Sequence, residues 1–363
     1  MPLLWCSISG HGFGHAAQVT PVLNELGARL PGLRAILRTT VPASFFEARL
    51  TIPWTLSPAR QDIGCIQHGP LVIDIEATWK AHLTFHDDWD RLIEMERREM
   101  ASAAPDLVLS DISHLSIDAA ARSGFRPIAL SSLSWDAILQ GYLSPSSPVV
   151  AEQHAAIAHI RRCYEAAEVL IRPAPGMDLP AFKSIADVGP IVEPITPESA
   201  RLRDAIGAGW EERLVLVGFG GISLTDLPYE RMEQTAGCRF FIDGRPPRSF
   251  QRIHSALDLG MTFMTVLASV DMIITKPGYS TIVEAVDKRK PVIYVRRHHF
   301  GDEASLVEYL HRYGRGAELS LGDFSSGQWE SALDAAWHAP QPADQPPASG
   351  VAQAADLLAP FLV

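Results

Sequence analysis

Short runs of β-branched and other apolar residues alternate with longer, helix-like stretches along most of this 363-residue chain. This alternation constrains the fold most strongly, because strands separated by helices pair in parallel and are covered on both faces. The expected strands form two groups, at 3–9, 34–39, 106–110, 127–131 and 169–172, and at 214–218, 239–243, 272–275 and 292–296. The expected helices include 15–30, 90–103, 116–122, 280–287 and 302–313. The sequence therefore predicts an α/β protein built on two parallel sheets.

A proline-rich seam separates the two groups of strands, with six prolines between Arg172 and Arg213. Prolines stop regular elements, so we place a domain boundary near residue 195. One Rossmann-like domain is expected over 1–195 and a second over 196–340, facing each other across a central cleft. Residues 341–363 join a second proline-rich segment to a helical pattern that could fold back on the first domain.

Composition narrows the classes of function. Apolar residues make up 47% of the chain, enough for large cores, and no apolar run approaches the ~18–20 residues that cross a bilayer. The net charge of −11 argues against a nucleic-acid surface. The N-terminus lacks the basic stretch and cleavage site of a secretory signal. We expect a cytoplasmic protein in which the four cysteines, far apart and without metal-binding spacing, are free thiols: Cys6, Cys65, Cys163 and Cys238.

The first expected strand runs directly into a glycine-rich turn at 10–15, and a helix follows. Such a turn lets the backbone approach a ligand and points free N–H groups and the positive end of a helix dipole into a crevice. Residues 12–17 fit the G-x-G-x-x-A pattern of dinucleotide sites, but the acidic residue expected about 20 positions later is missing. Arg38 ends the second strand and would suit a 2′-phosphate, so an NADP site stays open as an alternative.

Two histidines lie in this turn. His15 stands at the expected helix start, where the dipole lowers the pKa of the imidazole and favours its neutral form. A neutral imidazole at a crevice is a candidate general base, whereas His11 is expected to pack against a neighbouring loop. Asp111 follows the strand 106–110 at the same sheet edge and could orient His15, as the acid does in a Ser-His-Asp triad. The alternative role of Asp111 is a helix cap.

Two further strand–glycine–hydroxyl–helix turns occur at 218–223 and 276–281. Their backbone N–H groups, hydroxyls and helix N-termini suit a diphosphate. The residues expected to contact it are Gly220, Gly221, Ser223, Lys276, Gly278, Tyr279, Ser280 and Thr281. Glu284, one helical turn further on, can accept two hydrogen bonds from a ribose diol. Neither turn has the G-K-[ST] of a Walker A motif, which argues against that type of ATP hydrolysis.

The loop after the last expected strand lies at the same sheet edge. Arg297 is expected to neutralise phosphate there, and the acids Asp302 and Glu303 to hold sugar hydroxyls. The paired histidines of this loop give only a weak metal pattern beside these acids. His82 and His86 are one helical turn apart but lack the glutamate of H-E-x-x-H, so we interpret them as a solvated helix face.

Several segments resemble the GT-B glycosyltransferase superfamily. Gly14 and His15, with Pro21 and Leu23 further on, look like its GH-x-x-P-x-L opening, and 277–293 look like its donor-binding segment. Nearly the whole chain also resembles the glycosyltransferase-like N-terminal region of plant L-arabinokinases and their free-standing bacterial relatives. The matching segments are GHGFGHA (10–16), DLVLSD (106–111), SWD (134–136), LIRPAPGMDLPAF (170–182), KPGYSTIVEA (276–285) and VRRHHFGDEASL (295–306). The kinase half of those plant proteins has no match here, so the resemblance does not imply arabinose phosphorylation.

In this superfamily the first domain holds the acceptor and the base, the second holds a nucleotide-sugar, and no metal or other cofactor is required. The resemblance implies that His15 is the base and Asp111 its partner. On the donor side it implies, besides the diphosphate turn and the ribose ligand Glu284, contacts from Arg297, Phe300 and Glu303. On the acceptor side the corresponding residues are His11, Gly12, Phe13, Gly14 and Trp135. Gln18 departs from the basic residue often found at its position, so a charge contact is lost.

Together these features predict a metal-independent, inverting glycosyltransferase. It would move a sugar from a nucleoside-diphosphate sugar, with UDP or TDP as the nucleotide, to a small-molecule hydroxyl acceptor. A fold does not fix the chemistry that it carries. A nucleotide-sugar hydrolase, an epimerase and a non-catalytic nucleotide-sugar-binding protein therefore remain as alternatives.

Overall fold

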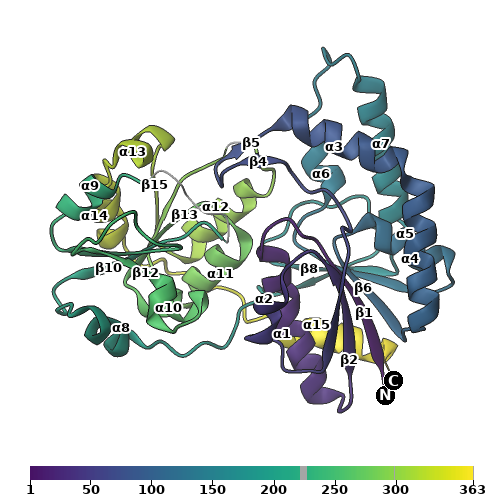
Figure 1. The fold of residues 1–363 in the computed structure, drawn as a ribbon, viewed down its shortest axis with the longest axis horizontal. Helices are drawn as coiled ribbons and strands as arrows, with labels where there is room; N and C mark the ends of the chain where they lie inside the picture. The colour runs from purple at the N-terminus through teal and green to yellow at the C-terminus, as the bar shows by residue number, and fades with distance from the viewer. Residues whose placement is uncertain (221–226, 298, 363) are drawn as a thin grey trace.

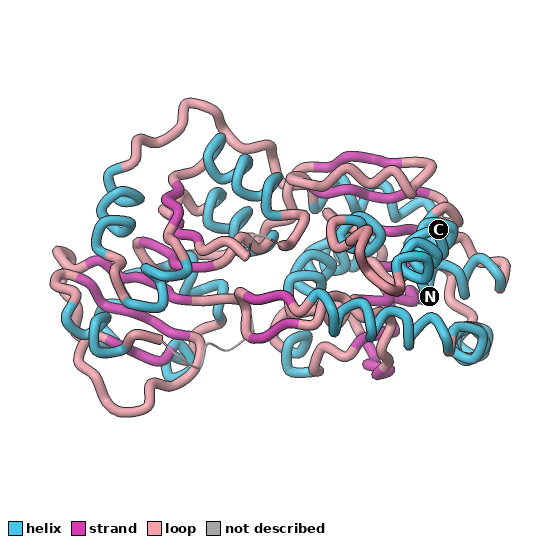
Figure 2. The backbone as a smooth tube through the Cα atoms, turned by 90° about the horizontal axis from the view of Figure 1, so that it is seen from above, coloured by secondary structure: helices cyan, strands magenta, loops and turns pink. Residues whose placement is uncertain are grey.

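The computed structural model describes residues 1–220, 227–297 and 299–362, which form two α/β domains lying side by side (Figure 1, Figure 2). Each domain is built on one parallel sheet, as the alternation of strands and helices predicts. Within the described residues, no helix is both long enough and apolar enough to cross a membrane. Three residues named above lie outside the described ranges: Gly221, Ser223 and the first histidine of the 296–303 loop.

In the described part of the first domain, the sheet has seven strands in the order β3-β2-β1-β6-β7-β8-β9. They are β1 (Leu3–Ile8), β2 (Arg34–Thr39), β3 (Trp54–Pro58), β6 (Leu107–Asp111), β7 (Pro127–Leu130), β8 (Val169–Pro173) and β9 (Ile185–Val188). The helices are α1 (Gly14–Arg29), α2 (Ala43–Glu47), α3 (Ile75–Asp87), α4 (Trp89–Ala103), α5 (His114–Arg122), α6 (Trp135–Gln140) and α7 (Val150–Tyr164). A short antiparallel pair, β4 (Gln67–His68) and β5 (Val72–Ile73), lies outside this sheet.

The second domain repeats this plan with a six-stranded parallel sheet, in the order β12-β11-β10-β13-β14-β15 over the described ranges. Its strands are β10 (Arg213–Val217), β11 (Cys238–Ile242), β12 (Ile253–Ser255), β13 (Met272–Thr275), β14 (Val292–Tyr294) and β15 (Gly316–Glu318). Its helices are α8 (Ser199–Ile206), α9 (Tyr229–Gln234), the 3₁₀ turn η1 (Ala256–Leu259), α10 (Phe263–Ser269), α11 (Tyr279–Asp287), α12 (Glu303–Tyr313), α13 (Leu321–Ser326) and α14 (Glu330–His338).

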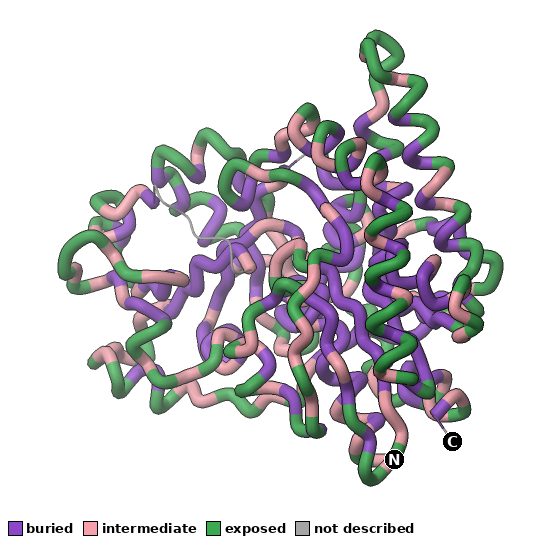
Figure 3. The backbone as a smooth tube through the Cα atoms, turned by 45° about the vertical axis from the view of Figure 1, so that its right-hand side comes forward, coloured by how far each residue is buried: buried purple, intermediate pink, exposed green. Residues whose placement is uncertain are grey.

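Burial follows the apolar runs of the central strands. In β1, Leu4, Trp5, Cys6 and Ile8 are all essentially inaccessible to solvent. Figure 3 shows buried strands at the centre of the molecule and exposed residues along the outer helices. Each fully buried large apolar side chain contributes roughly 1.5–3 kcal/mol relative to exposure. Burial of these strands therefore stabilises the two sheets. The turns that follow the strands are less constrained by packing and can hold functional residues.

The strand order reverses at one place in each sheet, between β1 and β6 and between β10 and β13. In open α/β sheets, ligands bind outside the carboxyl ends of the strands at such switch points. The glycine-rich turns follow β1, β10 and β13, so they lie at these positions. The parallel register pairs Ile8 at the end of β1 with Asp111 at the end of β6.

The chain crosses between the domains twice. It leaves β9 through residues 189–198 and returns through 339–350, after which α15 (Val351–Leu358) and the 3₁₀ turn η2 (Ala359–Phe361) follow. α15 packs on α1, where Arg29 pairs with Asp356. The two termini lie next to each other in Figure 1. The second domain is therefore inserted between two parts of the first.

The prediction that His82 and His86 form a solvated helix face is wrong. His82 is fully buried, with Nε2 at 2.9 Å from the carbonyl oxygen of Gly64, and His86 is half-buried beside His114. The physical reason is α7, which packs on α3 and covers this face.

Candidate active site

A cavity of about 470 Å³ lies between the domains and is walled by the turns that leave the two sheets. The predicted site residues that line it are His11, Gly12, Phe13, Gly14, His15, Gly220, Lys276, Gly278, Tyr279, Ser280, Thr281, Arg297 and Phe300. The predicted residues that do not line it are Asp111, Trp135, Glu284 and Glu303. The domains touch at this cavity, because the Ser280 hydroxyl donates to the carbonyl oxygen of Gly14 at 3.3 Å.

His15 and Asp111 form a buried pair in the wall of the cavity. Nδ1 of His15 lies 2.8 Å from Oδ1 of Asp111, which is fully buried. The geometry follows from the fold: Asp111 ends β6 beside the end of β1, and His15 stands in the first turn of α1. The hydrogen bond at Nδ1 fixes the tautomer and leaves Nε2 for a ligand.

The direction of the pKa shift of His15 differs from the prediction. Burial lowers its pKa, but the charge and the hydrogen bond of Asp111 act the other way and leave the pKa raised above 6.5. The expected lowering by the helix dipole is therefore wrong in sign. The dipole amounts to about half a charge at a helix end, whereas the carboxylate of Asp111 is a whole charge at hydrogen-bond distance.

A second carboxylate, Asp62, lies near the two histidines and was not predicted. Its Oδ1 accepts from the Ser9 hydroxyl at 3.0 Å, and its Oδ2 accepts from Nε1 of Trp135 at 2.8 Å. The ring of Trp135 is fully buried, with its centroid 5.3 Å from that of His11 and 5.8 Å from that of His15. The structure thus does not support Trp135 as an acceptor contact, because its bond to Asp62 directs it inward. No local motif marks Asp62, which lies in an irregular loop.

His11 connects the two domains. Its ring stacks on Phe300 with centroids 5.7 Å apart, and its Nδ1 accepts from the backbone N–H of Cys65 at 3.2 Å. Burial, followed by the positive charges of His15 and Arg297, holds the pKa of His11 well below 6.5. The imidazole of His11 is therefore neutral and packs against a neighbouring loop, while one face of it reaches the cavity.

The start of α11 is built to receive an anion. Gly278 is its N-cap and offers no side-chain cap, which leaves the first N–H groups of the helix without a cap from the residues that the structure describes. Lys276 lies beside them, and its Nζ donates to the carbonyl oxygen of Phe219 at 2.9 Å. Burial, reinforced by the charge of Arg297, lowers the pKa of Lys276 to about 7. A bound diphosphate would hold this amine protonated.

Glu284 does not reach the cavity. It is 2% exposed, and its Oε1 accepts from the backbone N–H of Glu193 at 2.5 Å. Burial raises its pKa to about 8. The physical reason is that the interdomain segment 189–198 passes over the second turn of α11 and covers the carboxyl. The structure therefore does not support Glu284 as a ribose ligand.

Of the two adjacent acids expected to hold sugar hydroxyls, only Asp302 lines the cavity. Glu303 turns away from the cavity, and its Oε1 accepts from Nε of Arg297 at 2.6 Å. Asp302 lines the cavity, and its Oδ1 is buried without a hydrogen-bond partner among the described residues. Burial raises the pKa of Asp302 to about 6. α12 begins at Glu303, so the acid at the cavity and the acid in the helix are consecutive residues.

The remaining lining residues were not assigned from the sequence, since they meet only when the domains meet. They are Ala17, Gln18, Ser44, Phe45, Ala48, Arg49, Gln67, Ser132, Leu133, Phe219, Asp243, Leu257, Thr262, Phe263, Met264 and Thr275. Phe13 and Phe45 pack with centroids 5.3 Å apart and form an apolar wall near His15. Asp243 alone had a signal, because it is a polar residue directly after the apolar strand β11.

The chain was compared with known proteins. No family model matches it. L-arabinokinase of Arabidopsis thaliana is 27% identical over 338 residues, which are 91% of this chain and 31% of that protein. The chain thus spans about a third of the length of this relative.

Solved structures give a similarity of fold. A UDP-glucosyltransferase from Polygonum tinctorium matches with a TM-score of 0.62 at 14% identity, covering 99% of this chain and 98% of that chain. Arabidopsis thaliana UGT89C1 complexed with UDP gives 0.60 at 14% identity, covering 99% of both chains. The calicheamicin glycosyltransferase CalG4 gives 0.60 at 17%, covering 99% of this chain and 94% of that chain. With its two parallel-sheet domains, this chain has the GT-B fold of these glycosyltransferases.

Proposed function

We propose that this protein is a metal-independent, inverting glycosyltransferase that moves a sugar from a nucleoside-diphosphate sugar to a small-molecule hydroxyl. One observation carries the proposal. His15, which is hydrogen-bonded to Asp111, and the uncapped start of α11 belong to different domains but line the same cavity. A base on one side and an anion site on the other are what a direct displacement at a sugar carbon needs.

The reaction would proceed in one step. Nε2 of His15 takes the proton of the acceptor hydroxyl while the oxygen attacks the anomeric carbon. The bond from that carbon to the phosphate oxygen breaks on the opposite face, so the configuration inverts. Asp111 keeps Nδ1 protonated and stabilises the imidazolium that forms.

The departing diphosphate would be stabilised by the protein itself. The N–H groups at the start of α11 and the positive charges of Lys276 and Arg297 face the site where negative charge develops. We therefore propose that transfer requires no metal ion or other cofactor. Full activity in the presence of EDTA is the expected result.

The donor nucleotide is proposed to be UDP or TDP. The support is the fold, which is shared with a structure complexed with UDP. Asp302 would hold a hydroxyl of the donor sugar, because it lines the cavity and its Oδ1 has no hydrogen-bond partner among the described residues, with only the ion pair to Nη2 of Arg297 at 3.6 Å. We further propose a cytoplasmic location, since all four cysteines are free.

Two measurements test this function. A thermal-shift screen with UDP, TDP, GDP and ADP sugars should find one nucleotide that stabilises the protein by mass action. With that donor and a panel of hydroxyl acceptors, His15→Ala should lower turnover by roughly 10²–10⁴-fold at unchanged donor affinity. His154→Ala, an exposed histidine on α7, is the matched control and should leave turnover unchanged.

The products separate the alternatives. Free sugar formed without an acceptor would identify a hydrolase, and an epimerised donor an epimerase. Binding without any turnover would identify a nucleotide-sugar-binding protein. Each of these three outcomes would overturn the transferase proposal.

A further inference from the structure

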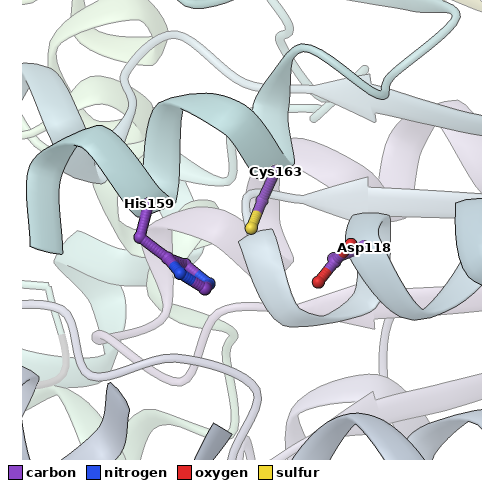
Figure 4. A group of neighbouring side chains, drawn as sticks. All are labelled: Asp118, His159 and Cys163. Atoms are coloured by element: carbon purple, nitrogen blue, oxygen red, sulfur yellow. The ribbon is translucent and has the colours of Figure 1, made fainter. Parts of the chain in front are cut away.

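A second cluster of reactive side chains lies between α5 and α7, in the helical layer of the first domain away from the second domain (Figure 1). α5 contributes Asp118, and α7 contributes His159 and Cys163. The last two are four residues apart and therefore share one face of the helix. Figure 4 shows the three side chains directed into the same space between the helices. One ligand atom from each, a carboxylate oxygen, an imidazole nitrogen and the sulfur, lies within 4.8 Å of the other two.

The imidazole of His159 has one unsatisfied nitrogen among the described residues. Its Nε2 is buried and has no hydrogen-bond partner in the part of the chain that the structure describes. Cys163 is 4% exposed and its thiol is free. Buried polar nitrogens are rarely left without a partner in folded proteins. A ligand that accepts electron pairs from nitrogen, sulfur and oxygen together would give His159 its missing partner and engage Cys163 and Asp118 as well.

The surroundings hold these side chains in place. Nε1 of Trp89 donates to Oδ2 of Asp118 at 3.2 Å, and its ring packs edge-on against His159 with centroids 4.6 Å apart. Trp89 therefore orients two of the three donors, as groups around a metal site do. Arg122 also pairs with both oxygens of Asp118, Nε with Oδ1 at 2.9 Å and Nη2 with Oδ2 at 2.8 Å. The side chain of Arg122 is 46% exposed, so it can stay on one oxygen or turn into solvent while the carboxylate binds a cation.

We propose that Asp118, His159 and Cys163 bind a divalent transition-metal ion, and that zinc fits the donor set best. Zinc takes thiolate, imidazole and carboxylate ligands in a tetrahedron, whereas Ca²⁺ and Mg²⁺ require oxygen ligands. Water would fill the fourth position. Zinc bonds of about 2.0–2.3 Å place neighbouring donors roughly 3.5 Å apart, so binding requires the three atoms, which lie within 4.8 Å of one another, to approach by at most about 1.3 Å.

The charge balances on binding. The Cys163 thiol loses its proton to solvent, Arg122 turns from the Asp118 carboxylate into solvent, and the thiolate and that carboxylate together neutralise the two positive charges of the ion. The site would link α5 to α7 and so stabilise the helical layer of the first domain. It contains no residue of the proposed transfer site, so the two proposals stand or fall separately.

Cobalt(II) is the direct probe, because a cobalt–thiolate bond gives an intense ultraviolet charge-transfer band that nitrogen and oxygen ligands do not give. We expect the full-length apo-protein to bind one equivalent of cobalt with this band, and zinc to remove it by competition. Cys163→Ser should abolish the band. Cys238→Ser, which alters an equally buried cysteine in the second domain, should keep it. No band in the wild type, or a band that survives in Cys163→Ser, would overturn the proposal.

A second variant covers the case in which a buried serine prevents folding. His159 is only partly buried, so His159→Gln should fold, and circular dichroism verifies this. Zinc should raise the Tm of the wild type and of Cys238→Ser but not that of His159→Gln. An equal rise in Tm in His159→Gln would show that zinc binds elsewhere.

Discussion

At the scale of single residues, the charge of Asp111 and its hydrogen bond with His15 act against burial and raise the proton affinity of His15. The neutral imidazole is the form that accepts a proton, and its pKa is raised above 6.5, so the activity of the wild type should fall as the pH drops through a value above 6.5. In Asp111→Asn the charge that raises this pKa is removed and burial lowers it. We expect the acid limb of the kcat/KM profile to move to lower pH while kcat at the optimum falls by roughly 10²-fold or more. An unmoved acid limb would show that the titrating base is not His15.

Asp302 carries the second residue-scale prediction. In Asp302→Asn, the loss of a charged hydrogen bond to a sugar hydroxyl, worth roughly 1.5–3 kcal/mol, should weaken nucleotide-sugar binding by about 10–100-fold. The affinity for the free nucleoside diphosphate should hardly change, because the sugar is absent. Titration calorimetry with both ligands gives the comparison. An equal loss for both would place Asp302 at the nucleotide and not at the sugar.

The choice between Asp302 and Glu303 shows where sequence reasoning stops. The sequence predicts two acids at the carboxyl edge of the sheet, and both are there. Which one faces the cleft depends on the residue at which α12 begins, and helix ends cannot be predicted to one residue. Glu284 is a similar case, because the segment that covers it comes from another part of the chain.

At the scale of elements, local patterns located the strands that carry the glycine-rich turns to within a residue or two. They did not show β9 or α8, which lie in the proline-rich seam. β9 is an edge strand that pairs only with β8, so its formation depends on that partner and not on its own sequence. The same holds for α3, whose histidine face is buried only because α7 packs on it.

The turn between β1 and α1 gives the element-scale prediction. Gly12 has a φ of +76°, which costs a residue with a side chain roughly 1–2 kcal/mol, and it lies opposite Gly220 of the other domain. Gly12→Ala should therefore lower the Tm by a few degrees and reduce turnover, because the turn also positions His15. Gly14→Ala is the matched control, since φ is ordinary there and an added Cβ meets nothing within 4 Å. Equal Tm values for the two variants would contradict the argument.

At the scale of the whole molecule, Glu284 connects the second domain to the interdomain segment through Glu193. Burial raises its pKa to about 8 in the folded state, well above the usual 4.5, so the folded protein binds this proton more tightly than the unfolded chain. Stability from this group is therefore full at low pH and declines as the pH rises from about 4.5 to 8. Glu284→Gln cannot ionise. When the pH is raised from 5 to 8.5, the Tm of the wild type should therefore fall by a few degrees more than the Tm of Glu284→Gln.

The same variant tests the place of Glu284 relative to the cleft. Because the carboxyl lies outside the cavity, Glu284→Gln should bind nucleotide-sugars as tightly as the wild type does. A loss of affinity of 10-fold or more, measured by titration at pH 7, would show that Glu284 binds the ribose after all.

The two crossings between the domains meet at one point. The backbone N–H of Gly350 donates to the carbonyl oxygen of Pro190 at 2.8 Å, and a Cβ on Gly350 would lie 2.1 Å from the carbonyl oxygen of Gly189. Both connections are therefore in contact at this point, where one hydrogen bond and close backbone packing join them. Any change in the angle between the domains would have to bend both connections together, and it would also break the contact of Ser280 with Gly14 across the cleft.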